Sequence, residues 1–219
     1  MGRFEKTLQS FAAQERDSRY VFVFLGSVFI FLITGLQVLS AGLFDSIERP
    51  VFDYFNSLPN VLHGIMYCIT QLGGLGGLVF WVLAGWYLVK RRGAITVAIA
   101  GILAWPLAQF AKALFHRDRP QGLLDQVNLF NGGAFSGFGF PSGHCTFAAA
   151  CATALYFQVP RKYRKYLIII VILVGISRMY LGAHFPLDVV GGWALGAFIG
   201  SLVMVAAGVT RKSSKVPDH

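Results

Sequence analysis

The sequence predicts an all-α membrane protein, a bundle of six transmembrane helices with both termini in the cytoplasm. Hydrophobic residues make up 55% of the 219-residue chain and charged residues only 13%, whereas about 25% of a typical soluble domain is charged. The apolar residues are gathered in long stretches, and most basic residues lie between alternate stretches. These observations favour the bilayer as the solvent of the folded chain.

Six stretches are long enough to cross the hydrocarbon core, which takes about 20 mostly apolar residues. They cover roughly residues 21–40, 63–89, 94–113, 142–158, 167–182 and 187–209. The first could be a cleaved signal peptide, but its apolar run from Val21 to Leu39 exceeds the usual length of about 7–15 residues. We therefore expect it to stay as a transmembrane helix.

The whole chain, residues 1–219, is expected to form one membrane domain. Residues 1–19 carry Phe4, Leu8 and Phe11 at a spacing typical of an amphipathic helix on the cytoplasmic surface. Residues 20–209 form the helical bundle, and residues 210–219 a cytoplasmic tail. Residues 43–62 are expected to form an interfacial helix and loop that cover part of the extracytoplasmic face.

The net charge of +9 could indicate a nucleic-acid partner, but the positions of the charges favour a membrane topology instead. Fourteen of the 19 basic residues form four clusters, before the first stretch, after the second, between the fourth and fifth, and after the sixth. With the amino terminus inside, every cluster is cytoplasmic, as the positive-inside rule requires. We expect the bilayer, and no nucleic acid, as the partner.

Glycines recur every four residues in two of the stretches, at Gly73 and Gly77 and again at Gly192, Gly196 and Gly200. This spacing puts them on one face of a helix, where small residues let neighbouring helices approach closely. The glycine pairs around residue 75 could instead bind phosphate, but the lysine of a P-loop is missing there.

Five basic residues depart from the charge pattern and fall near the extracytoplasmic side. They are Arg49, Lys112, Arg117, Arg119 and Arg178. Ionisable residues near membrane depth are costly, and a group of Arg and Lys indicates an anionic ligand. The same topology brings two histidines and one aspartate to this side. They are His144, His184 and Asp188.

Three short motifs contain most of these residues. The first is a lysine followed after six residues by Arg-Pro, the second is Pro-Ser-Gly-His, and the third is Ser-Arg, five residues, His, three residues, Asp. They comprise Lys112, Arg119, Pro120, Pro141, Ser142, Gly143, His144, Ser177, Arg178, His184 and Asp188. In this order and spacing, the chain resembles the type 2 phosphatidic acid phosphatases, integral membrane lipid phosphatases related to soluble vanadium-dependent haloperoxidases.

The resemblance implies a reaction without a metal or other cofactor. His184 would be the nucleophile that forms a phosphohistidine, and His144 the general acid for the departing lipid oxygen. Asp188, four residues after His184, would fix the ring tautomer. A two-metal site would need several ligands, and the motifs supply one carboxylate.

Five motif residues would bind the phosphate. They are Lys112, Arg119, Ser142, Gly143 and Arg178. Arginine can bind phosphate bidentately and lysine supplies a point charge. The backbone N–H groups of residues 142 and 143 and the Ser142 hydroxyl lie where a helix begins and could hold phosphate oxygens. Taken singly, the lysine could merely extend its amine to the surface, and each histidine could be inert.

The motifs leave some neighbouring residues open. His116, Arg117 and Asp118 are expected to be solvated or to support the site. The phenylalanines at 135, 138 and 140 could line a lipid entrance or could simply belong to an interfacial belt.

The sequence thus predicts a lipid phosphate phosphatase with an extracytoplasmic site, in the cytoplasmic membrane of a bacterium. Its substrate would be undecaprenyl diphosphate, phosphatidylglycerophosphate, phosphatidate or a lipid A phosphate, and the sequence does not choose among them. A lipid phosphotransferase of the same family and a non-catalytic lipid transporter or scaffold are the alternatives. The oligomeric state stays open.

Overall fold

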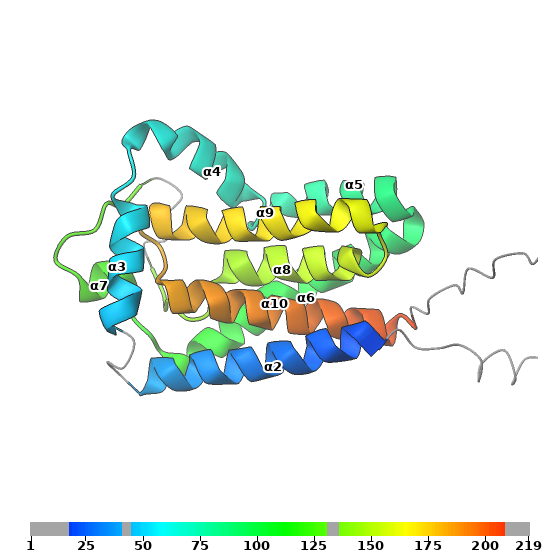
Figure 1. Cartoon of the computed structure of the whole chain (residues 1–219), viewed down its shortest axis with the longest axis horizontal. Coiled ribbons are helices and arrows are strands. Elements are labelled where there is room, and N and C mark those ends of the chain that lie inside the picture. The colour runs from blue at the N-terminus through cyan, green and yellow to red at the C-terminus, as the bar shows by residue number, and fades with distance from the viewer. Residues whose placement is uncertain (1–17, 41–44, 131–135, 209–219) are drawn as a thin grey trace, which may run out of the picture.

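The structure is a computed structural model that describes residues 18–40, 45–130 and 136–208. Within these ranges every regular element is a helix (Figure 1). The elements are α2 (Ser18–Leu39), α3 (Asp45–Asn56), the 3-10 helix η1 (Asn60–Leu62), α4 (His63–Gln71), α5 (Gly77–Val89), α6 (Arg91–Phe115), α7 (Pro120–Leu123), α8 (Gly143–Tyr156), α9 (Arg161–Tyr180) and α10 (Pro186–Ala206). The predicted amphipathic helix and the tail lie outside the described residues.

Three of the described helical stretches are long and apolar enough to cross a membrane, namely Val21–Leu39, Arg91–Leu123 and Pro186–Ala206. Large apolar side chains face outward from them, and Phe22 on α2 and Phe110 on α6 are 72% and 65% exposed. Such a surface fits a lipid environment. The all-helical membrane architecture is therefore confirmed, while the number of six spans stays a prediction.

The predicted second span, residues 63–89, is not one helix. It is divided into α4 and α5, with a turn at residues 72–76 between them. The turn packs on α8, because a Cβ on Gly73 would lie 2.7 Å from the His144 carbonyl oxygen. The expectation that Gly73 and Gly77 share one helix face is therefore wrong, since Gly77 begins the second helix.

The core centres on α8, whose residues 145–152 are all buried and include several alanines. On α10, Gly192, Gly196 and Gly200 all face α8, where an added Cβ would meet the backbone of that helix. The expected close packing at this glycine face is confirmed. It fixes the starts of α8 and α10 side by side.

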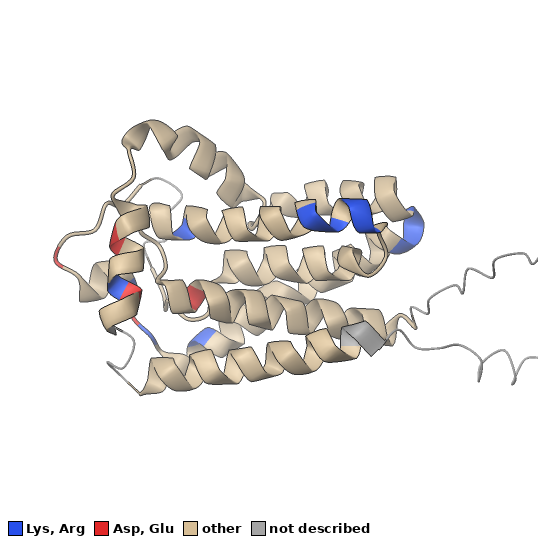
Figure 2. Ribbon diagram, in the orientation of Figure 1, with Lys and Arg blue, Asp and Glu red and all other residues tan. Residues whose placement is uncertain are grey.

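The two ends of the bundle differ in charge. Basic residues at the turn into α6 and at the start of α9 gather where α2 begins and α10 ends (Figure 2). The opposite end carries the acidic residues and is crossed by α3 (Figures 1 and 2). The helix expected within residues 43–62 is present as α3, while its interfacial position stays a prediction.

Candidate active site

Four helix ends bring the motif residues together. Lys112 lies in the last turn of α6 and Arg178 in the last turn of α9. His144 is the second residue of α8, and His184 stands two residues before α10. Cations are favoured near helix carboxyl ends and anions near amino ends. Residues far apart in sequence thus meet at one end of the bundle.

A cavity of about 390 Å³ lies between these helix ends. Six of the eight predicted site residues line it. They are Lys112, Arg119, Gly143, His144, Arg178 and His184. The rest of the described lining comes from α6 and from the loop before α8, with Trp105, Gln109, Ala113 and residues 136–138. One cavity is therefore lined by three cations, two histidines and the start of α8.

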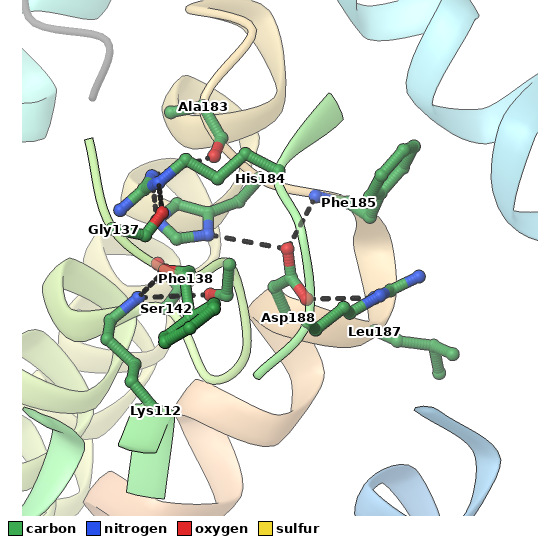
Figure 3. Close-up of polar contacts among 12 residues, drawn as sticks. Lys112, Gly137, Phe138, Ser142, Ala183, His184, Phe185, Leu187 and Asp188 are labelled. Carbon is green, nitrogen blue, oxygen red and sulfur yellow. Dashed lines mark hydrogen bonds and ion pairs between the residues drawn. The ribbon is translucent and has the colours of Figure 1, made fainter. Parts of the chain in front are cut away.

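His184 and Asp188 are held by the start of α10 (Figure 3). Pro186 is the first residue of the helix, where its missing N–H costs nothing. Asp188 Oδ2 accepts a hydrogen bond from the Phe185 N–H at 3.0 Å and lies 3.4 Å from His184 Nδ1. The aspartate thus caps the helix and orients the imidazole with one oxygen.

The other ring nitrogen of His184 faces the cations. Arg119 Nη1 lies 3.3 Å from Nε2 and 3.0 Å from the Ala183 carbonyl oxygen. A guanidinium can only donate, so Nε2 must be the acceptor and the proton belongs on Nδ1, facing the carboxylate. Burial lowers the pKa of His184 well below its usual range, and Lys112, Arg119 and Arg178 lower it further. The ring is therefore neutral, with a lone pair on Nε2.

Lys112 and Arg119 also hold the loop that borders the cavity. Lys112 Nζ donates to the carbonyl oxygens of Phe138 and Gly139, the latter at 3.2 Å. Arg119 Nε donates to the Gly137 carbonyl oxygen at 2.8 Å. Both cations are anchored by neutral carbonyl oxygens, which leaves their positive charge available to an anion.

Arg178 and His144 complete the walls. Arg178 is 1% exposed, and its Nη1 donates to Thr70 Oγ1 at 2.9 Å. His144 packs edge-on against Trp105, with the ring centroids 6.1 Å apart. A Cβ on Gly74 would lie 3.5 Å from His144 Nε2. The glycine in the turn between α4 and α5 therefore leaves space for the His144 ring.

Ser142 and Asp188 do not line the cavity. The Ser142 backbone N–H donates to the Asp188 carbonyl oxygen at 2.8 Å, and Ser142 is fully buried. The expectation that this N–H holds a phosphate oxygen is wrong, because it ties α8 to α10. The Gly143 N–H has no helical acceptor at this position, and Gly143 does line the cavity.

The three phenylalanines separate. Phe138 lines the cavity, whereas Phe140 is fully buried and packs against Phe31 and Phe115, with centroid distances of 5.8 and 4.8 Å. Residue 135 lies outside the described residues. In the described parts of the chain, no three His, Cys, Asp or Glu side chains converge as a metal site would require.

The sequence did not predict the contacts of Arg117. Its Nη1 lies 2.8 Å from Asp188 Oδ1, and its guanidinium also contacts both carboxylate oxygens of Glu48 on α3. Arg117 is one of the five cations that depart from the charge pattern, and this position in the sequence indicated a role at the site. Nothing in the sequence indicated such a role for Glu48, because an acidic residue on an amphipathic helix normally faces water.

Residues 93–211 match the PAP2 superfamily. Phosphatidylglycerophosphatase B of Bacillus subtilis (strain 168) is 46% identical over 157 residues, which cover 65% of this chain and 73% of that protein. An undecaprenyl-diphosphatase of Sulfolobus acidocaldarius is 32% identical over 112 residues, 51% of this chain. Those residues are 54% of the relative, so the chain spans about half its length.

A solved structure shares the fold. It is described as the first transmembrane PAP2 type phosphatidylglycerolphosphate phosphatase from Bacillus subtilis, and it covers 87% of this chain and 96% of its own. The TM-score is 0.66 and the identity 27%. The family match spans more than half of the chain, and it confirms the resemblance seen in the motifs. The chain therefore belongs to the PAP2 superfamily.

Proposed function

We propose that the protein hydrolyses a lipid phosphate ester or diphosphate through a phosphohistidine at His184, without a metal. The observation that carries this proposal is the placement of the His184 ring, with Nδ1 beside Asp188 and Nε2 beside Arg119 in a cavity of cations. A neutral imidazole with its lone pair toward an anion site is an activated nucleophile.

In the first step, His184 Nε2 attacks phosphorus and the bond from phosphorus to the lipid oxygen breaks. His144 gives that oxygen a proton, so the lipid leaves as an alcohol or as a lipid monophosphate. Lys112, Arg119 and Arg178 line the same cavity and would stabilise the charge on the three equatorial oxygens. The positive ring of the phosphohistidine is stabilised by Asp188.

In the second step, water attacks the phosphohistidine. His144, now neutral, takes a proton from this water, and the bond between Nε2 and phosphorus breaks. Inorganic phosphate leaves, His184 is again neutral, and His144 again carries its proton. The gains and losses of protons balance over the two steps, so no other reactant is needed.

The proposed topology has six spans and both termini in the cytoplasm of a bacterium, with the site on the extracytoplasmic side. The charge asymmetry between the two ends of the bundle supports it (Figure 2). A lipid would keep its tails in the bilayer while its phosphate enters the cavity. The similarity to phosphatidylglycerophosphatase B makes phosphatidylglycerophosphate the first substrate to test, followed by undecaprenyl diphosphate, phosphatidate and lipid A.

The test is phosphate release by the purified protein from each of the four lipids, with EDTA present, compared with His184→Ala. We expect release from at least one lipid that survives EDTA and disappears in the variant. Equal release by the variant, or none by the wild-type protein, contradicts the proposal. Transfer of phosphate to a second lipid in place of free phosphate would identify a phosphotransferase.

A further inference from the structure

We infer that Glu48, on α3, is a positioning residue for His184 and Asp188 and acts through Arg117. This inference rests on the proposed function. Glu48 belongs to none of the three motifs, and α3 contributes no residue to the described lining of the cavity. Its carboxylate nevertheless reaches the start of α10 from across the end of the bundle.

The contacts form one continuous network. Arg117 lies between two carboxylates, with Nη1 3.1 Å from Glu48 Oε1 and 2.8 Å from Asp188 Oδ1, and with Nη2 on Glu48 Oε2. Glu48 Oε1 also accepts the Leu187 N–H at 2.8 Å. Glu48 thus binds both Arg117, which contacts Asp188, and the first turn of α10.

The contacts among Glu48, Arg117 and Asp188 are strong because all three side chains are largely buried. The side chain of Glu48 is 4% exposed, that of Arg117 12% and that of Asp188 0%. Charges removed from water interact strongly and are poorly screened by salt. Exposed ion pairs contribute far less, and α3 offers one for comparison between Arg49 and Asp53, at 3.8 Å.

The charge balance explains why a second carboxylate is needed. Asp188 must favour a positive ring when His184 is phosphorylated, but alone with Arg117 it would form a neutral pair. Glu48 shares the guanidinium, so the three groups together keep a net charge of about −1 toward the ring when both carboxylates are ionised. Without Glu48, Arg117 would neutralise Asp188 and weaken its attraction for the ring.

The helix α3 is fixed well enough to hold Glu48 in place. Asn56, its last residue, exchanges hydrogen bonds with Asn128 and donates to the Tyr180 carbonyl oxygen at 2.9 Å. Phe52 is fully buried and packs on Phe185, with ring centroids 5.2 Å apart. The second half of α3 is therefore attached to the segments that carry the site.

The test compares Glu48→Gln with Asp53→Asn, the same acid-to-amide change at an exposed position of the same helix. We expect kcat to fall about 10- to 100-fold in Glu48→Gln, the range seen for outer partners that orient a histidine ligand. KM should change less than about twofold, because Glu48 does not line the cavity. Asp53→Asn should keep the wild-type kcat.

A thermodynamic cycle adds a readout that a merely structural role would not change. If Glu48 acts through Arg117, the double variant Glu48→Gln/Arg117→Gln should have a kcat no lower than Arg117→Gln alone. Multiplicative losses would overturn the inference. If Glu48→Gln does not fold, Arg117→Lys, which keeps the charge without the bidentate fork, should show the same fall in kcat, and an unchanged kcat would overturn it.

The outcomes separate this inference from the proposed function. A wild-type protein without hydrolase activity overturns both. An active wild-type protein that is inactivated by His184→Ala, combined with a Glu48→Gln variant of unchanged kcat, overturns only the role of Glu48. A rise in KM at unchanged kcat would also overturn it, because such a change would mean that Glu48 binds the lipid.

Discussion

At the scale of single residues, Asp188 combines three contacts that serve different purposes. One oxygen caps α10 at the Phe185 N–H and faces His184, and the other receives Arg117. A helix cap cannot move without unwinding the first turn. The orientation of His184, the proposed nucleophile, is therefore coupled to the stability of α10.

Replacing this carboxylate by an amide tests its role in fixing the tautomer. Asp188→Asn should lower kcat by up to about 10⁴-fold, the loss that amide replacement of the carboxylate causes in a serine-protease triad. Steady-state phosphate release measures the effect, and Asp125→Asn, in an exposed loop, is the control. A kcat within twofold of the wild-type value would mean that Asp188 does not orient the ring.

The buried imidazole also predicts how stability depends on pH. Burial and the surrounding cations lower the pKa of His184 in the folded protein, whereas the unfolded chain should have a pKa near about 6.5. Below about pH 6.5 the unfolded state binds a proton at His184 and the folded state does not. The neutral His184 therefore contributes fully to the free energy of unfolding above this pH, and the contribution is lost as the pH falls below it.

Thermal unfolding in detergent between about pH 8 and pH 5 measures this effect. The midpoint should fall less steeply with acidification in His184→Gln than in the wild-type protein. Parallel curves for the two proteins would contradict the lowered pKa.

Most of the residues that line the candidate site could be predicted from the sequence because their spacing within short motifs is local information. Glu48 and Arg117 could not be assigned to each other, since they are 69 positions apart and a paired charge resembles a solvated one in sequence. The backbone N–H of Ser142 was misjudged for a related reason, while the role of its hydroxyl stays a prediction. Only the packing of α8 on α10 shows that its N–H is already bonded.

At the scale of elements, the site depends on how closely α8 and α10 approach. The added Cβ of an alanine at Gly196 would meet the Thr146 carbonyl oxygen and lie 2.7 Å from the Ala149 Cβ. Cores tolerate such overpacking poorly. The contact between α8 and α10 thus requires glycine, which has no side chain, at positions 192, 196 and 200.

Gly196→Ala should lower stability by about 1–3 kcal/mol and reduce activity, because the starts of both helices separate. Gly26→Ala is the matched control, since a Cβ there meets nothing within 4 Å. Thermal midpoints in detergent and phosphate release check both variants. If Gly196→Ala is as stable as Gly26→Ala, the close contact is not required.

The break between α4 and α5 shows what an element prediction misses. Residues 63–89 are apolar almost throughout, and hydropathy alone favours one continuous span. The turn is fixed by tertiary contact, since Gly73 fits against the His144 backbone and the Val174 side chain. The glycines were visible in the sequence, but the helix they had to accommodate was not.

At the scale of the whole molecule, the two ends of the bundle should lie on opposite sides of the membrane. Lys162 at the start of α9 and Asp125 just after α7 are both exposed, so each can be replaced by cysteine. Cys68 is the exposed native thiol and should first be changed to serine.

In intact cells, a membrane-impermeant maleimide should label Asp125→Cys and leave Lys162→Cys unlabelled until the membrane is opened. The cysteine-depleted parent protein is the control for background labelling. The reverse pattern would place the cavity in the cytoplasm and overturn the proposed topology.

The division of residues 63–89, the predicted second span, into α4 and α5 affects how the protein would assemble in the membrane. At about 1.5 Å per residue, the nine residues of α4 and the 13 of α5 are each too short for a hydrocarbon core of about 30 Å. Insertion responds to hydrophobicity along the chain, so we expect residues 63–89 to enter the bilayer as a single apolar unit. The turn at residues 72–76 would form only when α8 packs against it. The packing around His144 would therefore form late in assembly.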